Sequence, residues 1–84
     1  MITILPITRD LQSKVNRYNL RKKFEKQLSL LVRNSKHPSL RVELLEPKWR
    51  GICSFRIDRK YRALFIFRSN QQVIEILSVT VHYR

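Results

Sequence analysis

The spacing of the apolar residues changes once along this chain, from a helical period to an alternating one. Before Pro38, the residues Leu20, Phe24, Leu28 and Leu31 recur at intervals of three and four, which is the period of an amphipathic helix. After Pro38, apolar and polar residues alternate, which is typical of strands with one buried face. The sequence therefore predicts an α+β fold in which the helices come first and most of the strands follow.

The expected elements follow the order β-α-α-β-β-β-β. Residues 2–5 predict a short strand that Pro6 ends, and Thr8 predicts the N-cap of a first helix. Asn19 is expected to break this helix and to cap a second one that ends near Asn34. The four later strands are expected within residues 40–44, 53–57, 61–68 and 73–83. Their short connections favour antiparallel pairing into a twisted sheet, and two helices can cover only one face of it.

The alternation also predicts on which face of the sheet each residue lies. The helix-covered face is expected to hold Leu40, Val42, Leu44, Cys53, Phe55, Ile57, Phe65, Phe67, Leu77, Val79 and Val81. The opposite face is expected to be mixed, with polar and basic residues beside Leu64, Ile66, Ile74 and Ile76. A fully solvated face would not need four aliphatic residues, so we expect this open face to have a basic end and an apolar end.

The chain is strongly basic, since 18 Lys and Arg against 6 Asp and Glu give a formal net charge of +12 over 84 residues. A hydrophobic content of 43% excludes a disordered basic tail. The charge therefore belongs to a folded domain, expected to span residues 1–84 as one unit. Charge of one sign costs stability through self-repulsion, and it usually indicates binding to a polyanion.

Several other classes of protein are excluded by composition. The single cysteine excludes an intrachain disulfide and a cysteine zinc cluster, and the single glycine excludes a glycine-rich phosphate loop. No apolar run approaches the ~20 residues of a membrane span, and the N-terminus lacks the pattern of a signal peptide. We therefore expect a cytoplasmic protein without a membrane partner. Cys53 has apolar neighbours in its alternation, so we expect a core residue rather than a nucleophile.

A group of ionisable residues on the later strands shares one parity, so their side chains are expected to converge on the open face. The group consists of Arg41, Glu43, Arg56, Arg62 and His82. The planar guanidinium groups can bind phosphate bidentately, while a carboxylate and an imidazole can transfer protons. These groups are the minimum for cleaving RNA through its own 2′-hydroxyl, with no metal or other cofactor. The alternative is a set of solvated side chains, in which the glutamate forms only a surface ion pair.

The last half of the chain resembles the RelE/ParE superfamily of bacterial type II toxin–antitoxin systems. The resemblance rests on Ser39-Leu40-Arg41, Leu44-Leu45, Gly51, Ser54-Phe55-Arg56-Ile57, Tyr61-Arg62-Ala63-Leu64-Phe65 and the final His82-Tyr83. It implies a toxin domain with two helices on one face of a mainly antiparallel sheet. It also implies an endoribonuclease that cleaves mRNA in the ribosomal A site without metal, contacts ribosomal RNA, and is wrapped by a cognate acidic antitoxin.

The resemblance to the YoeB-like branch of this superfamily assigns roles to individual residues. It implies that Glu43 is the general base on the 2′-hydroxyl, that His82 is the general acid, and that Arg62 stabilises the scissile phosphate. The roles of Glu43 and His82 could be exchanged, because coupled groups resist assignment from sequence. Arg56 matches the position where RelE-like members have a basic phosphate contact, and Tyr83 could stack on or orient a base. Arg84 is a departure, because the tyrosine ends the chain in YoeB-like toxins.

The second predicted helix carries a row of cations that favours contacts with ribosomal RNA, although a solvated face is the alternative. This predicted ridge consists of Arg21, Lys22, Lys23, Lys26, Arg33 and Lys36. Arg41 joins these residues as a candidate phosphate contact. Trp49 is expected to pack on the edge of the sheet, with stacking on a nucleobase as the alternative.

The sequence is also compatible with two other functions. One is a ParE-like inhibitor of DNA gyrase without catalysis, a class that generally lacks the Glu43 and His82 pair. The other is a basic RNA-binding domain or a toxin that has lost its activity.

Overall fold

The computed structural model describes residues 2–81 of the chain. Its helices and strands are β1 (Thr3–Ile4), α1 (Arg9–Arg17), α2 (Arg21–Arg33), β2 (Glu43–Leu44), β3 (Ile52–Arg56), β4 (Tyr61–Arg68) and β5 (Val73–Val81). Short 3-10 helices at Pro38–Leu40 and Lys48–Arg50 lie on either side of β2. The predicted β-α-α-β-β-β-β order and α+β class are confirmed.

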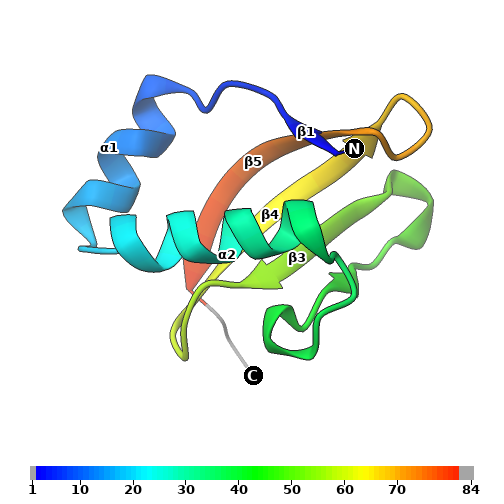
Figure 1. The fold of residues 1–84 in the computed structure, drawn as a ribbon. Coiled ribbons are helices and arrows are strands. Elements are labelled where there is room, and N and C mark those ends of the chain that lie inside the picture. Colours follow the sequence, from blue (N-terminus) through cyan, green and yellow to red (C-terminus); the bar gives the residue numbers. More distant parts are fainter. Residues whose placement is uncertain (1, 82–84) are drawn as a thin grey trace.

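The strands form one sheet in the order β1-β5-β4-β3-β2. β1 pairs with β5 in parallel, and the other pairings are antiparallel, as the short connections predict. In Figure 1, α2 lies across one face of the twisted sheet and α1 lies beside it. Neither helix has the length and hydrophobicity that crossing a membrane requires, among the residues described.

The helices begin and end largely where the sequence predicts. Thr8 caps α1, and its Oγ1 accepts a hydrogen bond of 3.3 Å from the N–H of Leu11. Asn19 breaks the helix in a left-handed conformation with φ of 56°. The prediction that Asn19 also caps α2 is wrong, because Leu20 occupies the N-cap position without a side-chain hydrogen bond. Leu20 is instead held by burial and by a 2.9 Å hydrogen bond from its N–H to the carbonyl of Val15.

The core lies between α2 and the covered face of the sheet. Phe24 and Leu31 of α2 are buried against this face, while Leu28 is only partly buried. The ring of Phe24 lies 6.3 Å from that of Phe55 on β3, which lies 5.7 Å from that of Phe65 on β4. This aromatic row connects the helix to the two central strands and fixes which face of the sheet is left open.

The predicted faces of β5 are wrong over its first half. The pairing of β4 and β5 shifts by one residue, from Leu64 opposite Ser78 to Phe65 opposite Ile76, so Leu77 is a β-bulge. A shift of one residue reverses the face on which every side chain before the bulge lies. Ile74 and Ile76 are therefore buried in the core, and Leu77 is 41% exposed. The open face thus lacks two of the four aliphatic residues expected on it.

The strand predicted over residues 40–44 is also shorter than expected. The chain forms a 3-10 helix up to Leu40, and Arg41 has a left-handed backbone with φ of 46°, so pairing begins only at Glu43. Leu40 is buried as predicted, whereas Val42 and Leu44 are exposed rather than covered. An edge strand has a neighbour on one side only, so its side chains receive little cover.

Candidate active site on the open face

Arg62 is the centre of a polar cluster on the open face of the sheet. Its Nη1 donates a hydrogen bond of 3.2 Å to Oγ of Ser54 and lies 3.3 Å from Oε2 of Glu43. The side chain of Arg62 is 12% exposed and that of Glu43 is 57% exposed. The guanidinium is therefore held close to the sheet, and the carboxylate remains open to solvent.

The strand register explains why these three side chains meet. Glu43 is the Cα partner of Ser54, and Ser54 is the partner of Leu64, which lies two positions from Arg62 on β4. Ser54 and Arg62 alternate along their strands with the buried Phe55 and Phe65, and Glu43 is paired with Ser54. All three side chains therefore face away from the helices. The structure brings Glu43 and Arg62 together as the alternation predicts, and their roles in catalysis stay a prediction.

The electrostatics of this cluster favour an anionic ligand. A guanidinium has five N–H donors, and among the described residues the side-chain contacts of Arg62 are made by Nη1 alone. Removing a charge from water is costly unless it is paired, so Glu43 stabilises the largely covered cation of Arg62. A phosphate could replace this carboxylate and bind the planar fork bidentately.

Arg56 is the Cα partner of Arg62 and so shares the predicted face at the end of β3, whereas Arg41 precedes the strand pairing that begins at Glu43. Both line an open hollow of about 870 Å³ between α2, the first 3-10 helix and the β3–β4 turn. The Nε of Arg56 donates to the carbonyl of Asp58 at 3.3 Å. Arg41 lies outside β2, because its left-handed backbone ends the 3-10 helix. The hollow is lined by Lys23, Lys26, Gln27, Leu30, Arg33, His37, Pro38, Ser39, Arg41, Arg56, Ile57 and Asp58.

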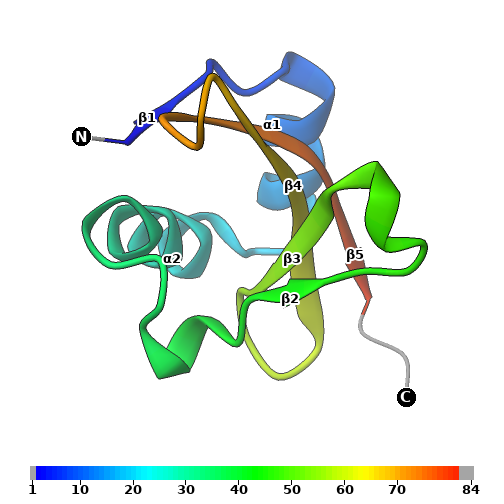
Figure 2. The same ribbon diagram turned by 90° about the vertical axis from the view of Figure 1, so that its right-hand side faces the viewer.

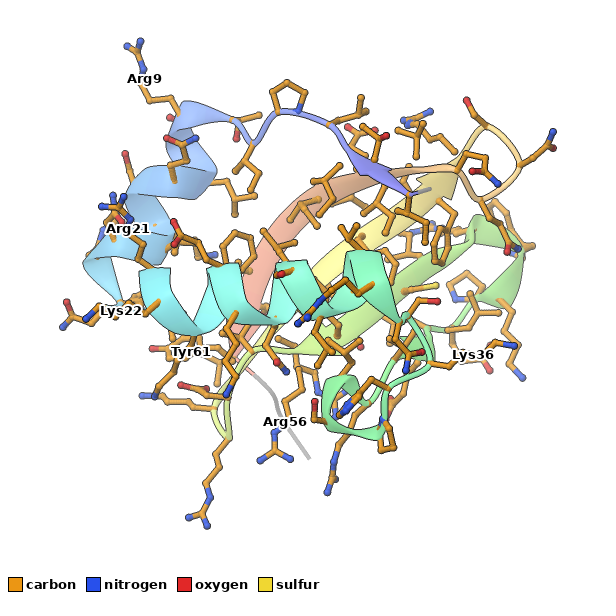
Figure 3. All side chains as sticks on the ribbon, viewed as in Figure 1. Arg9, Arg21, Lys22, Lys36, Arg56 and Tyr61 are labelled. Carbon is orange, nitrogen blue, oxygen red and sulfur yellow. The ribbon has the colours of Figure 1, made fainter. Side chains whose placement is uncertain are left out.

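The cations of α2 do not form the single ridge that the sequence predicts. Lys23, Lys26 and Arg33 line the hollow beside Arg56, whereas Arg21 forms an ion pair with Glu25 at 3.3 Å. In Figure 3, Lys22 and Arg56 lie well apart, and Lys22 is near the beginning of α2. Two predicted groups, the helix cations and the strand arginines, are thus partly joined in one basic hollow.

Gln27 supports this hollow and was not singled out from the sequence. It is buried, and its Nε2 donates to the carbonyl of Arg56 at 2.8 Å and to that of Ser39 at 3.4 Å. These bonds connect α2 to the end of β3 and to the first 3-10 helix. A signal was present, because Gln27 lies three residues after Phe24, within the stripe that faces the core.

Asp58 holds the β3–β4 turn beside the hollow. Its Oδ1 accepts hydrogen bonds of 2.8 Å from the N–H groups of Lys60 and Tyr61, and its Oδ2 lies 3.3 Å from Nζ of Lys23. Burial by itself would raise the pKa of this carboxyl group. The hydrogen bonds and the charge of Lys23 outweigh burial and lower the pKa below its ordinary value.

Asp58→Ala is expected to reduce the free energy of unfolding by about 1–3 kcal/mol at neutral pH, because two backbone donors lose a charged acceptor. A lowered pKa stabilises the fold only while the carboxyl is ionised, so the difference from wild type should shrink as the pH falls below about 4. Urea unfolding at a series of pH values measures this. Glu25→Ala, which removes an exposed ion pair, is the control and should show little change.

The predicted core role of Cys53 agrees with its surroundings. The residue is buried, and burial raises the pKa of its thiol, which keeps the nucleophilic thiolate scarce at neutral pH. We expect Cys53 to resist thiol reagents in the folded protein and to react rapidly in urea. A reaction with Ellman's reagent at the same rate in both states would contradict this burial.

Two predicted site residues, His82 and Tyr83, lie outside the described residues. The described part of β5 ends at Val81, opposite Tyr61, and Thr80 is the Cα partner of Arg62. The chain therefore reaches the neighbourhood of Arg62 immediately before these residues in sequence. Among residues 2–81, no group of three or more His, Cys, Asp or Glu side chains is placed to hold a metal ion.

The prediction that Trp49 packs on the sheet edge is wrong. Trp49 lies in the second 3-10 helix, between β2 and β3, and is 81% exposed. The guanidinium of Arg50 lies over its ring, with the guanidinium carbon 5.4 Å from the ring centroid.

No protein-family model matches the chain, and no curated protein sequence matches it significantly. Solved structures of low sequence identity do match it over nearly their whole length. A YoeB/ParE toxin from Agrobacterium tumefaciens is 18% identical, with 98% of each chain covered and a TM-score of 0.72. A YoeB-YefM complex from Staphylococcus aureus contains a chain that is 26% identical, with 99% of this chain and 97% of that chain covered and a TM-score of 0.68.

YafQ from Escherichia coli is 9% identical, with 98% of this chain and 92% of that chain covered and a TM-score of 0.72. Sequence identity varies widely across these matches, whereas the coverage and the TM-scores hardly change. The shared property is therefore the arrangement of helices and strands. The chain has the fold of the RelE/ParE-superfamily toxins.

Proposed function

We propose that the chain is the toxin of a type II toxin–antitoxin system and an endoribonuclease that cleaves mRNA in the ribosomal A site. The observation that carries this proposal is the contact between Nη1 of Arg62 and the solvent-accessible carboxylate of Glu43 on the open face. The contact joins a guanidinium, which can bind phosphate, to a carboxylate, which can accept a proton. The fold shared with YoeB and YafQ chains and the net charge of +12 support it.

The proposed reaction uses the 2′-hydroxyl of the substrate as its nucleophile, so it needs no metal. The scissile phosphate binds the guanidinium of Arg62 and displaces Glu43, which becomes free to accept the 2′-hydroxyl proton. The 2′-oxygen then forms a bond to phosphorus as the bond to the 5′-oxygen breaks. Arg62 stabilises the charge that develops on the phosphorane, and His82 donates a proton to the leaving oxygen. The products are a 2′,3′-cyclic phosphate and a 5′-hydroxyl.

The basic hollow, which Arg56 lines next to its strand partner Arg62, would hold the polynucleotide beside the reacting phosphate. Arg41, Arg56, Lys23 and Lys26 can neutralise several phosphates of mRNA or ribosomal RNA, with Lys22 as a further contact. Tyr83 would stack on or orient a base near His82. We also propose a cognate acidic antitoxin as the protein partner, in keeping with the YoeB-YefM complexes among the similar structures.

The pH dependence of cleavage tests the proposed proton transfer. With Glu43 as base and His82 as acid, kcat/KM on programmed ribosomes should follow a bell-shaped pH profile. Glu43→Gln should lower the rate by about 10²- to 10⁴-fold and remove the acid limb, and His82→Gln should remove the alkaline limb. Glu75→Gln, which alters a carboxylate paired with Arg68, is the matched control and should leave the profile unchanged. A flat profile for the wild type would overturn these roles.

A ParE-like inhibition of DNA gyrase is the alternative function, since one similar structure is described as a YoeB/ParE toxin. In that case the chain would inhibit supercoiling by gyrase and leave ribosome-bound mRNA intact. The close contact of Glu43 with Arg62 favours the nuclease, because pure binding to a protein does not need a proton acceptor beside a phosphate-binding group.

A further inference from the structure

Trp49 is a large aromatic side chain that the described part of the chain leaves almost uncovered. It is the single tryptophan of the protein and is 81% exposed. Burial of a tryptophan side chain stabilises a small domain, and the exposed Trp49 adds little of this hydrophobic contribution to the stability of the fold. Exposed aromatic residues of this kind are enriched at binding sites.

The backbone around Trp49 is ordered by its own hydrogen bonds. The N–H groups of Arg50 and Gly51 donate to the carbonyls of Pro47 and Lys48 at 3.1 Å, which closes the 3-10 helix. Gly51 ends this turn with a φ of 70°, a conformation that glycine adopts without strain. The N–H of Leu45 also donates to the carbonyl of Ile52 at 2.8 Å, at the base of the connection. The indole is therefore presented on a short, closed loop.

The chemistry around the indole fits a nucleotide better than an apolar protein surface. The guanidinium of Arg50 lies over one face of the ring, with its carbon 5.4 Å from the centroid, in the geometry of a cation–π contact. Lys48 and Arg50 are the neighbours of the tryptophan in sequence, so two positive charges adjoin it in the chain. A flat aromatic ligand that carries negative charge complements both properties, and an unpaired nucleobase with its phosphate is such a ligand.

The loop lies on the side of the sheet where the candidate active site is. Figure 2 shows the connection between β2 and β3 on the opposite side of the sheet from α2. It joins the strand that carries Glu43 to the strand that carries Ser54, and both residues contact or adjoin Arg62 on that face. Arg62 is opposite Arg56 at the end of β3, and the connection enters β3 at Ile52, so an RNA strand bound at Arg62 reaches the loop by running along the length of β3.

We propose that Trp49 is a stacking platform for an unpaired base of the RNA that occupies the open face. The base stacks on the face of the indole away from Arg50, and Lys48 and Arg50 neutralise the adjoining phosphates. This inference rests on the proposed function, because it takes RNA as the ligand. Base stacking on an aromatic side chain corresponds to about a 5- to 150-fold gain in affinity.

The single tryptophan makes a direct test possible, because its fluorescence reports on Trp49 alone. The purified chain is titrated with a short single-stranded 2′-O-methyl RNA and with an oligonucleotide of equal length and charge that lacks bases. We expect the RNA to quench the fluorescence and the abasic oligonucleotide to bind, by fluorescence anisotropy of a labelled end, without quenching. Trp49→Ala should weaken RNA binding by about 5- to 150-fold and leave abasic binding unchanged. Trp49→Phe should restore part of the affinity.

Other outcomes would overturn the stacking role. Equal quenching by both oligonucleotides, or equal weakening of both by Trp49→Ala, would show a purely electrostatic contact. Quenching by a polyglutamate peptide but not by RNA would assign the tryptophan to an acidic protein partner. Cleavage of mRNA on ribosomes separates this inference from the proposed function. Cleavage without base-dependent quenching overturns only the stacking role, and base-dependent quenching without cleavage overturns only the nuclease.

Discussion

Arg62→Ala is expected to lower the rate of mRNA cleavage on programmed ribosomes by about 10²- to 10³-fold. The guanidinium of Arg62 can stabilise the negative charge that develops on the phosphorane, and it contacts Ser54 and Glu43, which help to hold it in place. Arg62→Lys should recover little of the rate, because an ammonium cannot bind two phosphate oxygens through a planar fork. Single-turnover cleavage, with primer extension to quantify the product, measures the effect.

Arg68→Ala is the matched control for this substitution. Arg68 lies on the same strand, is exposed, and pairs with Glu75 at the far end of β4 from Arg62. It should retain wild-type cleavage. Thermal unfolding of the Arg62 variants separates loss of chemistry from loss of fold, since Arg62 is largely covered. A folded Arg62→Ala variant that cleaves at the wild-type rate would remove Arg62 from the proposed mechanism.

Ile74→Ala is expected to reduce the free energy of unfolding by about 2–5 kcal/mol, whereas Leu77→Ala should change it by less than about 1 kcal/mol. Both substitutions shorten an aliphatic side chain on the same strand. Ile74 is fully buried in the core, and Leu77 is the exposed bulge residue. Urea unfolding of the two variants and the wild type measures the difference.

The two variants also test the strand phasing directly. Simple alternation places Leu77 in the core and Ile74 on the open face, so it predicts the opposite order of effects. A larger loss of stability for Leu77→Ala than for Ile74→Ala would show that the bulge is absent from the folded protein. It would also move the residues before the bulge to the other face of the sheet.

The parts of the fold that sequence predicts well are those with a long, regular period. The stripe of Leu20, Phe24 and Leu31 specifies α2, and the alternation of β3 and β4 places Phe55 and Phe65 in the core. The cap at Thr8 was predictable because its chemistry is local. Glu43 and Arg62 could be brought together for the same reason, since only the faces of adjacent strands had to be correct.

The errors arise where a single residue changes the backbone or where cover comes from distant parts of the chain. The bulge at Leu77 has no glycine or proline to mark it, and one extra residue was enough to reverse Ile74 and Ile76. Arg41 has a left-handed backbone that a strand pattern cannot reveal, and this leaves it outside the strand pairing that begins at Glu43. The exposure of Trp49 depends on how the other helices and strands pack around it, and a local sequence pattern does not show this packing.

Cleavage mapping on ribosomes is the most direct test of the proposed nuclease function. The purified chain is incubated with ribosomes that carry a defined mRNA and an empty A site, and both ends of any fragment are identified. We expect a cut within the A-site codon that leaves a 2′,3′-cyclic phosphate and a 5′-hydroxyl, and that is lost in Arg62→Ala. Intact mRNA, together with inhibition of gyrase supercoiling by the same preparation, would contradict it.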